Sequence, residues 1–466
     1  MTRPRSTGPT GDIDWPATDR WLFGEAWVGA RISEHARQLC DLIGPRWSGG
    51  EAEWRAIEYV RDQFVACGLD GVEIEEFDMR SWSWSKASIS IVNGPALDTL
   101  PFIGCPSFQI QADVVDVGHG TAREVTAAGD RIAGAVALMN ISHEPFSTPV
   151  PHAYRLRAIA AAGAVAAIAV DPKSGERREY HSAHDARDPD FSEPPLPCVA
   201  ITREAGALLR RRANPQICLD VVTALETKRT ANVHGFLQGQ LWPEEDLVMG
   251  GHHDTVFGTP GGNDNGSGTI ATLETARLLA GLRRENHTAP GRTLHFVTYA
   301  AEEQGFQGSF EFVRRHYESG RRPRLAINLD ELAAGHMKGI VIGFPHLRAL
   351  VQQQLDGMED QLQCHVMSQL DNSSDHFPYL ARGIDAAHLW RWRFRGRHAD
   401  SDYHHELPDS ADKLNVRELK EYAGQLSRLL LRLSHVPPQD WPEMGIPAEE
   451  AGQRVLAERG DVVRVY

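Results

Sequence analysis

Apolar residues repeat at helical spacing in two stretches near the N-terminus. Residues 32–43 (ISEHARQLCDLI) show this spacing until GPRWSGG interrupts it. Residues 51–67 (EAEWRAIEYVRDQFVAC) form a second stretch that ends before Gly68, and one face carries Trp54, Ile57, Val60 and Phe64. We predict a helix over each stretch, a poorly ordered arm over residues 1–25, and a strand over residues 72–77, where apolar and polar residues alternate.

The middle of the chain, residues 96–222, has short β-like runs separated by Pro and Gly. One compact α/β unit stands out, with strands predicted at 132–139 and 165–170 and an Ala-rich helix at 154–163. The loop that follows, residues 171–195, is charged and contains His181 and His184. We interpret it as a surface loop with solvated histidines in preference to a metal site.

From residue 232 onward, apolar strands alternate with amphipathic helices. Strands are predicted at 247–249, 293–299, 325–329 and 339–342, and helices at 270–282 and 309–317. This order predicts an α/β fold with a mixed, largely parallel sheet between layers of helices. Ligands of such sheets bind beyond the carboxyl ends of the strands.

Three of these strands run directly into acidic or imidazole side chains. The residues are His252 and Asp254, Glu302 and Glu303, and Asp330, while Asp264 follows in a Gly-rich turn, GGNDNGSG. Carboxylates crowded together would repel one another and raise their pKa values unless cations lie between them. Imidazole with carboxylate suits Zn²⁺, and a carboxylate that bridges two ions, for which Asp264 is the natural candidate, is typical of hydrolytic two-metal sites.

Each of these residues also has a plain structural interpretation. Asp264 alone would be read as a helix N-cap, Glu302 and Glu303 as a solvated helix end, and Asp330 as an ordinary strand end. Their joint occurrence, each at the end of a strand and in the order HxD, NDNGSG, AEEQG, NLD, favours a metal site.

The same motifs resemble the dizinc aminopeptidases of bacteria and fungi, whose wider family includes glutamate carboxypeptidases and glutaminyl cyclases. The resemblance covers roughly residues 30–95 and 232–435 and rests on GPRWSG, HHDTV, GGNDNGSG, AEEQGFQGS, INLD, SSDHFPYLARGI and HHELPDSADKL. The segment between resembles a protease-associated domain. Together, the two resemblances imply a zinc exopeptidase domain (26–95 and 223–436), an inserted protease-associated-like domain (96–222) and a C-terminal extension (437–466).

The resemblance also implies roles for single residues. His252 would bind one zinc ion, Asp264 would bridge two, Glu303 would join one ion and Asp330 the other. Asp254 would orient His252 by a hydrogen bond, and Glu302 would act as the general base.

A late histidine would complete the ligand set. We expect His405, because its spacing to DSADKL matches the family, although the tyrosine that often precedes this ligand stands before His404 instead. His253 and His376 are not expected to bind metal. In WRWRFRGRH (390–398) we favour a surface strand and loop over a basic rim in which Arg393 or Arg395 grips a substrate carboxylate.

Composition narrows the partners and the compartment. A formal net charge of -15 argues against nucleic acid and anionic membranes, and no segment is apolar enough to span a bilayer or to act as an export signal. The six scattered cysteines favour reduced thiols and a cytoplasmic location.

We therefore expect a zinc-dependent aminopeptidase with two Zn²⁺ per chain and a peptide or aminoacyl substrate. Carboxypeptidase or cyclase chemistry at the same site, an inactive binding protein of this fold, and a homo-oligomer stay open at this point.

Overall fold

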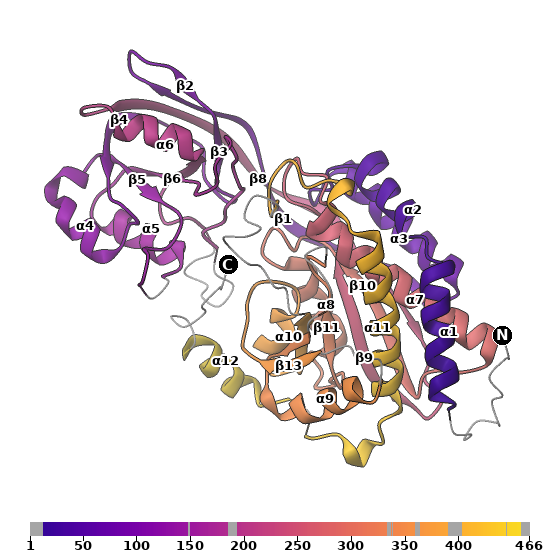
Figure 1. Ribbon diagram of the computed structural model, residues 1–466. Coiled ribbons are helices and arrows are strands. Elements are labelled where there is room, and N and C mark those ends of the chain that lie inside the picture. Colours follow the sequence, from indigo (N-terminus) through magenta and orange to yellow (C-terminus); the bar gives the residue numbers. More distant parts are fainter. Residues whose placement is uncertain are drawn as a thin grey trace. The chain divides into compact units, whose positions relative to one another are not determined.

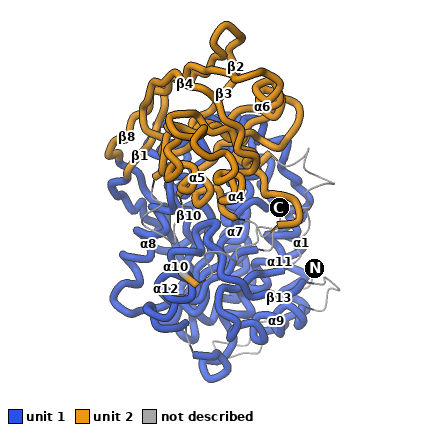
Figure 2. Tube along the Cα trace, turned by 90° about the vertical axis from the view of Figure 1, so that its left-hand side faces the viewer, with its two compact units in different colours: residues 1–79, 229–392, 407–455 blue, residues 80–228, 393–406, 456–466 orange. Residues whose placement is uncertain are grey.

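The computed structural model describes residues 13–147, 150–184, 193–332, 337, 339–358, 364–389, 403–443 and 445–457. The chain divides into two compact units, which Figure 2 colours separately. The first unit comprises residues 1–79, 229–392 and 407–455, and the second comprises residues 80–228, 393–406 and 456–466. The Arg-rich segment 390–398 lies outside the described residues.

The first unit is built on a mixed sheet in the strand order β13–β12–β14–β11–β9–β10–β8. Figure 1 labels β9, β10, β11 and β13 among these strands. Its strands are β8 (Gln216–Leu237), β9 (Trp242–His252), β10 (Arg292–Tyr299), β11 (Ala326–Asn328), β12 (Gly339–Ile342), β13 (His365–Ser368) and β14 (Ala386–Leu389), and β1 (Asp70–Ile91) pairs with β8. β9 lies between β10 and β11 and runs parallel to both, whereas β8 is antiparallel to β10. The predicted α/β fold with a largely parallel sheet is confirmed.

The helices predicted at 32–43, 51–67, 270–282 and 309–317 are present in this unit, and further helices accompany them. In chain order the helices are α1 (Trp15–Val28), α2 (Ile32–Ala36), which continues as a π-helical turn (Arg37–Ile43), α3 (Glu51–Cys67), α7 (Gly268–Asn286), α8 (Gln307–Tyr317), α9 (Arg348–Asp356), α10 (Phe377–Ala381), α11 (Val416–His435) and α12 (Ala448–Ala457). α3 has the predicted bounds, and its C-cap Gly68 adopts φ 92°, a conformation that glycine reaches without strain.

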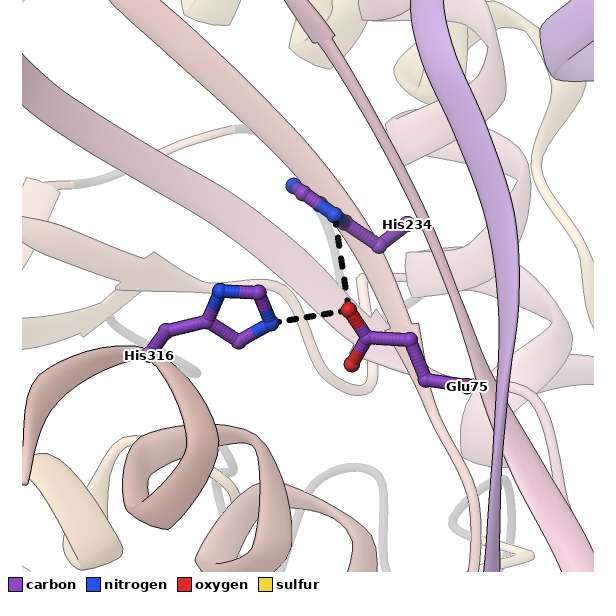
Figure 3. A group of neighbouring side chains, drawn as sticks. All are labelled: Glu75, His234 and His316. Carbon is purple, nitrogen blue, oxygen red and sulfur yellow. Dashed lines mark hydrogen bonds and ion pairs between the residues drawn. The ribbon is translucent and has the colours of Figure 1, made fainter.

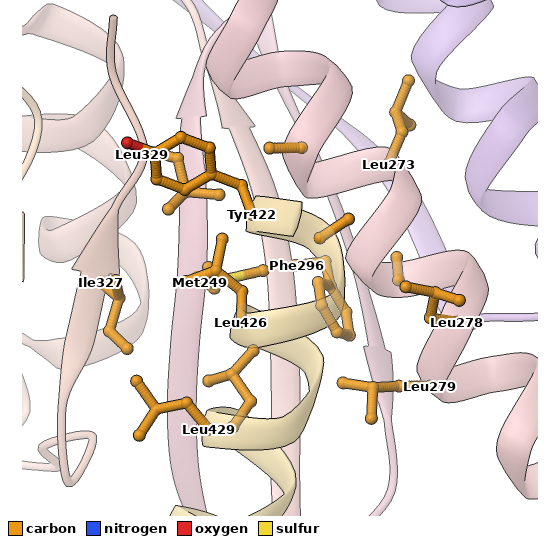
Figure 4. Packing of buried hydrophobic residues seen from close by; sticks show 14 of the residues in the cluster. Met249, Leu273, Leu278, Leu279, Phe296, Ile327, Leu329, Tyr422, Leu426 and Leu429 are labelled. Carbon is orange, nitrogen blue, oxygen red and sulfur yellow. The ribbon is translucent and has the colours of Figure 1, made fainter. Parts of the chain in front are cut away.

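The main core lies between one face of the sheet and helices α7 and α11 (Figure 4). Met249 of β9 and Phe296 of β10 point into it, as does Leu426 of α11. Because successive strand residues face opposite sides, His295 lies on the other face of β10. There its ring contacts that of His234, which in turn contacts Phe312 of α8. α8 therefore covers the face of the sheet opposite to α7 and α11.

In the second unit the strands follow the order β8–β4–β5–β6–β7–β3, and the unit has its own core. Its further elements are β2 (Ala96–Leu97), β3 (Thr99–Pro101), β4 (Phe108–Asp116), α4 (Ala122–Ala128), β5 (Val136–Asn140), α5 (His152–Ala161), β6 (Ala166–Val170), β7 (Cys198–Ile201) and α6 (Arg203–Arg210). The helix and strand predicted at 154–163 and 165–170 correspond to α5 and β6. The strand predicted from residue 132 begins later, because residues 129–132 form a 3₁₀ turn.

Two predictions at the chain ends need comment. Residues 1–25 were expected to be a poorly ordered arm, but Trp15–Val28 forms α1, which Asp14 caps by accepting a hydrogen bond from Ala17 N at 3.0 Å. Only a narrow stripe of α1 is buried, which is why its periodicity is weak in the sequence. In the extension 437–466, Ile446 N donates to Gly383 O at 2.9 Å, so this part packs on the first unit of its own chain.

Within the described residues, no helix has the length and apolar character needed to cross a bilayer. None of the six cysteines, all of which lie in the described part of the chain, forms a disulfide, and four of them are buried.

Candidate active site

The ends of β9, β10 and β11 bring the predicted acidic and imidazole side chains together. Because the three strands are parallel neighbours, His252, Glu302 and Asp330 come to the same edge of the sheet. His252 Nε2 lies 3.3 Å from Asp264 Oδ1, 3.5 Å from Asp330 Oδ1 and 3.8 Å from Glu302 Oε2. Glu303 belongs to the same group, since its carboxylate lies within 4.8 Å of ligand atoms of His252 and Asp264.

All of these side chains are buried, and His252 is fully so. Among the described residues, His252 Nε2 has no hydrogen-bond partner, yet it faces three carboxylate oxygens. A buried polar atom in such surroundings is expected to have a partner. A divalent ion with imidazole and carboxylate ligands satisfies this requirement, and the donor set fits Zn²⁺.

The proton affinities show the same need for a cation. Burial opposes the charged form of His252, but the carboxylates of Glu302, Asp254, Asp264 and Asp330 outweigh burial and raise its pKa well above the ordinary value. Burial also raises the pKa of Glu302 well above its usual range, and Glu303 adds to the rise while His252 opposes it. Both pKa values are raised, as expected for a cluster of carboxylates that has no positive charge between its members.

Asp254 contacts two parts of this cluster. Its Oδ1 lies 3.3 Å from His252 Nδ1 and accepts a hydrogen bond from the backbone N of Glu302 at 3.2 Å. His252 Nδ1 also lies 3.2 Å from the Asp254 backbone O. The contact between His252 and Asp254 is the one that the family resemblance led us to expect. His253 instead meets Thr298 Oγ1 at 3.1 Å.

The Gly-rich turn allows Asp264 to reach the strand ends. A Cβ on Gly251 or Gly268 would lie 2.1 Å from Leu329 O, so only glycine fits at either position. Asp409 holds the turn from the other side, since its two carboxylate oxygens accept hydrogen bonds from Asn263 N (2.8 Å) and Asp264 N (2.9 Å).

Several supporting residues were not predicted as part of the site. The buried Arg46 donates hydrogen bonds to five backbone carbonyl oxygens, including those of His253 and Pro260. Asp375 accepts a hydrogen bond from Ser309 at 2.6 Å, and burial raises the pKa of Asp375 to about 8. GPRWSGG and SSDHFPYL, noted as motifs, contain Arg46 and Asp375, but the sequence does not show which groups they would contact.

His405 belongs to the second unit and stays a predicted ligand. Its ring stacks on that of His404 at a centroid distance of 3.7 Å, and its Nδ1 lies 3.0 Å from Tyr180 O. A carbonyl partner fixes the proton on Nδ1 and so leaves Nε2 as the lone-pair nitrogen. Both histidines lie near Glu179.

In the described part of the charged loop 171–195, His184 is exposed as predicted, but His181 differs from its interpretation as a solvated histidine. His181 is buried, with its Nε2 3.8 Å from Asp171 and its Nδ1 3.6 Å from Glu179. Burial acts to raise the pKa of Glu179, but His181 and Lys173 outweigh it and lower that pKa below the usual range.

Comparisons with known proteins show which chains are similar to this one. Aminopeptidase YwaD of Bacillus subtilis is 25% identical over 408 residues, covering 84% of this chain and 81% of that protein. Bovine (Bos taurus) carboxypeptidase Q is 26% identical over 334 residues, covering 69% of this chain and 68% of that protein. The solved structure of BSAP, a zinc aminopeptidase from Bacillus subtilis, superposes with a TM-score of 0.68 at 20% identity, covering 89% of this chain and 97% of that one.

The fold is therefore that of the aminopeptidase structures. The model of Peptidase family M28 matches residues 232–430, the segment that supplies His252, Asp264, Glu302, Glu303 and Asp330. Over this segment the chain is similar to peptidase family M28.

Proposed function

We propose that the chain is a dizinc aminopeptidase that hydrolyses the N-terminal bond of peptides. The observation that carries the proposal is the position of His252 Nε2, buried and within 3.8 Å of three carboxylates at the convergence of three parallel strands. The similarity to an aminopeptidase over most of both chains supports the reaction class.

In this proposal His252, Asp264, Glu303, Asp330 and His405 would hold the ions, with Asp264 as the ligand common to both. The bound ions would polarise the scissile carbonyl and lower the pKa of a water molecule. Asp254 keeps the proton of His252 on Nδ1, so that Nε2 faces the carboxylates. Glu302 takes the proton of the attacking water and passes it to the departing amine.

The raised pKa of Glu302 describes the cluster without cations. Positive charge beside the carboxylate favours its ionised form and brings it toward the range in which a general base works.

Peptides that differ only at their N-terminus test the proposal. The full-length protein, loaded with Zn²⁺, should release the first residue from peptides with a free N-terminus and should leave N-acetylated peptides intact. Removal of metal by a chelator should abolish the release, and added Zn²⁺ should restore it. Hydrolysis of N-acetylated peptides at the same rate would contradict the aminopeptidase assignment.

Carboxypeptidase action is the second candidate, because carboxypeptidase Q is among the similar proteins. It predicts the opposite preference, in which N-acetylated peptides are cleaved and C-terminally amidated peptides are not.

The last ligand is tested separately. Replacing His405 by Ala should lower the number of bound zinc ions, whereas replacing His404 by Ala should not. Equal loss in both variants, or loss only in the His404 variant, would remove His405 from the ligand set.

A further inference from the structure

A second group of potential metal ligands lies within the first unit, apart from the residues discussed above. It consists of Glu75 on β1, His234 on β8 and His316 in the last turn of α8 (Figure 3). Glu75 Oε1 lies 2.8 Å from His316 Nε2 and 3.7 Å from His234 Nδ1. The three ligand atoms all lie within 4.8 Å of one another.

The fold explains why these residues meet. β1 and β8 are paired strands, and the ring contacts of His234 place it on the face of the sheet that α8 covers. His316 reaches the same point from α8, where its ring packs on Phe312 at a centroid distance of 4.3 Å. Three elements that are distant in sequence therefore converge on one carboxylate oxygen.

The carboxylate of Glu75 is in an unusual environment for an acid. The residue is 7% exposed, and its Oε2 has no hydrogen-bond partner among the described residues. A buried carboxylate is costly unless a cation or several donors compensate it. Among the described residues, His316 is the only hydrogen-bond donor to Oε1. Further positive charge beside the carboxylate would therefore stabilise it.

The hydrogen bonds of His234 indicate which of its nitrogens carries a proton. Its Nε2 lies 2.7 Å from His295 Nδ1, and His295 Nε2 lies 3.5 Å from the buried carboxylate of Asp246. A proton on His295 Nε2 faces that carboxylate favourably, and this leaves His295 Nδ1 to accept from His234 Nε2.

His234 Nδ1 is then the lone-pair nitrogen, and it points at Glu75 Oε1. Two electron-rich atoms face each other across 3.7 Å, an arrangement that a cation between them would stabilise. His295, which lies beside the carboxylate of Asp246, thus gives His234 Nε2 the kind of outer hydrogen-bond partner that metal-binding histidines usually have.

We propose that Glu75, His234 and His316 bind one divalent ion of the zinc class, separate from the ions of the candidate active site. Ligands about 2.0–2.2 Å from a tetrahedral zinc ion stand roughly 3.3 Å apart, and the observed separations of 2.8 and 3.7 Å bracket that value. Two imidazoles favour Zn²⁺ over Ca²⁺ or Mg²⁺, which prefer oxygen ligands. His316 is 31% exposed, which gives the ion a route from solvent.

The ion has a structural role in this proposal. It ties β1 and β8 to the end of α8, the helix that begins shortly after Glu302 and Glu303. Its binding should therefore raise the thermal stability of the unit more than it changes turnover.

Ion counting tests the proposal in the full-length protein. His316→Phe keeps the ring that packs on Phe312 but removes the ligand, and Glu75→Gln keeps the shape of the carboxylate. His346→Phe is the matched control, because His346 is similarly exposed (28%), pairs with Asp385 and stacks on Phe344. Each protein is dialysed against buffered Zn²⁺, and bound zinc is measured by mass spectrometry.

We expect His316→Phe and Glu75→Gln to bind one ion per chain fewer than the wild type, and His346→Phe to bind the same number as the wild type. Added Zn²⁺ should raise the midpoint of thermal unfolding of His346→Phe more than that of His316→Phe. Equal ion counts in His316→Phe and the wild type would overturn the proposal. Because the test compares the ion count of each variant with that of the wild type, its result does not depend on how many ions the candidate active site holds.

Discussion

The carboxylate of Asp409 offers a sharp test of how the turn around Asp264 is held. Asp409 is fully buried, and each of its oxygens accepts one backbone N–H, from Asn263 at 2.8 Å and from Asp264 at 2.9 Å. Asparagine has nearly the same shape but only one acceptor oxygen, so in Asp409→Asn an amide NH₂ would face one of the two N–H groups.

The size of the effect follows from these two bonds. A hydrogen bond to a charged group contributes about 1.5–3 kcal/mol, and the variant loses one of them. If this loss falls on the geometry of Asp264, zinc affinity should drop roughly 10- to 100-fold, since about 1.4 kcal/mol corresponds to a factor of ten. Outer hydrogen-bond partners of metal ligands commonly have effects of this size.

Competition with a chromophoric chelator measures the zinc affinity. Asp412→Asn is the matched control, because Asp412 lies on the same turn of chain but its side chain is 69% exposed and pairs with Lys413. We expect Asp412→Asn to bind zinc as the wild type does. If Asp409→Asn has the same affinity as Asp412→Asn, then Asp409 does not position the proposed bridging ligand.

Three further predictions concern the framework. Gly251→Ala should lower the free energy of unfolding by about 1–3 kcal/mol, because the new Cβ would lie 2.1 Å from Leu329 O. Gly24→Ala, with open space around the new Cβ, should not lower it, and thermal unfolding of both variants measures the difference. The pKa of Glu274 is lowered, because His35 and Arg277 outweigh the effect of burial. The ionised carboxylate therefore stabilises the fold above pH 4.5, and this contribution is lost as the pH falls through the lowered pKa. The difference in unfolding free energy between wild type and Glu274→Gln should shrink below about pH 4.5, and a constant difference would refute the assignment. Burial raises the pKa of Cys40 and of Cys105 to about 11, so both should resist iodoacetamide at pH 8 until urea is added, and rapid labelling in the native state would contradict their burial.

Local periodicity was enough to predict most elements of the first unit. α3 was predicted residue for residue, β10 within one residue and α7 within four, because each buries a continuous stripe or a run of apolar side chains. β9 begins five residues before its predicted range and ends three residues after it. α1 was missed, since its buried stripe is narrow and its pattern therefore resembles that of an exposed arm.

The gathering of the site residues could also be predicted, because parallel neighbouring strands must end at one edge. The partners of those residues could not. Asp409 and Arg46 act through contacts with backbone atoms that lie far away in sequence, and no motif spacing encodes such contacts. The Glu75–His234–His316 group is hidden for the same reason, since its members come from two long strands and a helix end.

The variant Glu302→Gln tests the central claim most directly, when zinc binding and peptide hydrolysis are measured on the same sample. Loss of a general base costs about 10²–10⁴-fold in turnover, while the side chain that remains is nearly isosteric. The account predicts that Glu302→Gln binds as many zinc ions as the wild type and releases N-terminal residues at least about 100-fold more slowly. A control on α8, Glu311→Gln, whose carboxylate pairs with Arg314 at 2.7 Å, should retain full activity. Glu302→Gln turning over at the wild-type rate with its zinc ions bound would contradict the account.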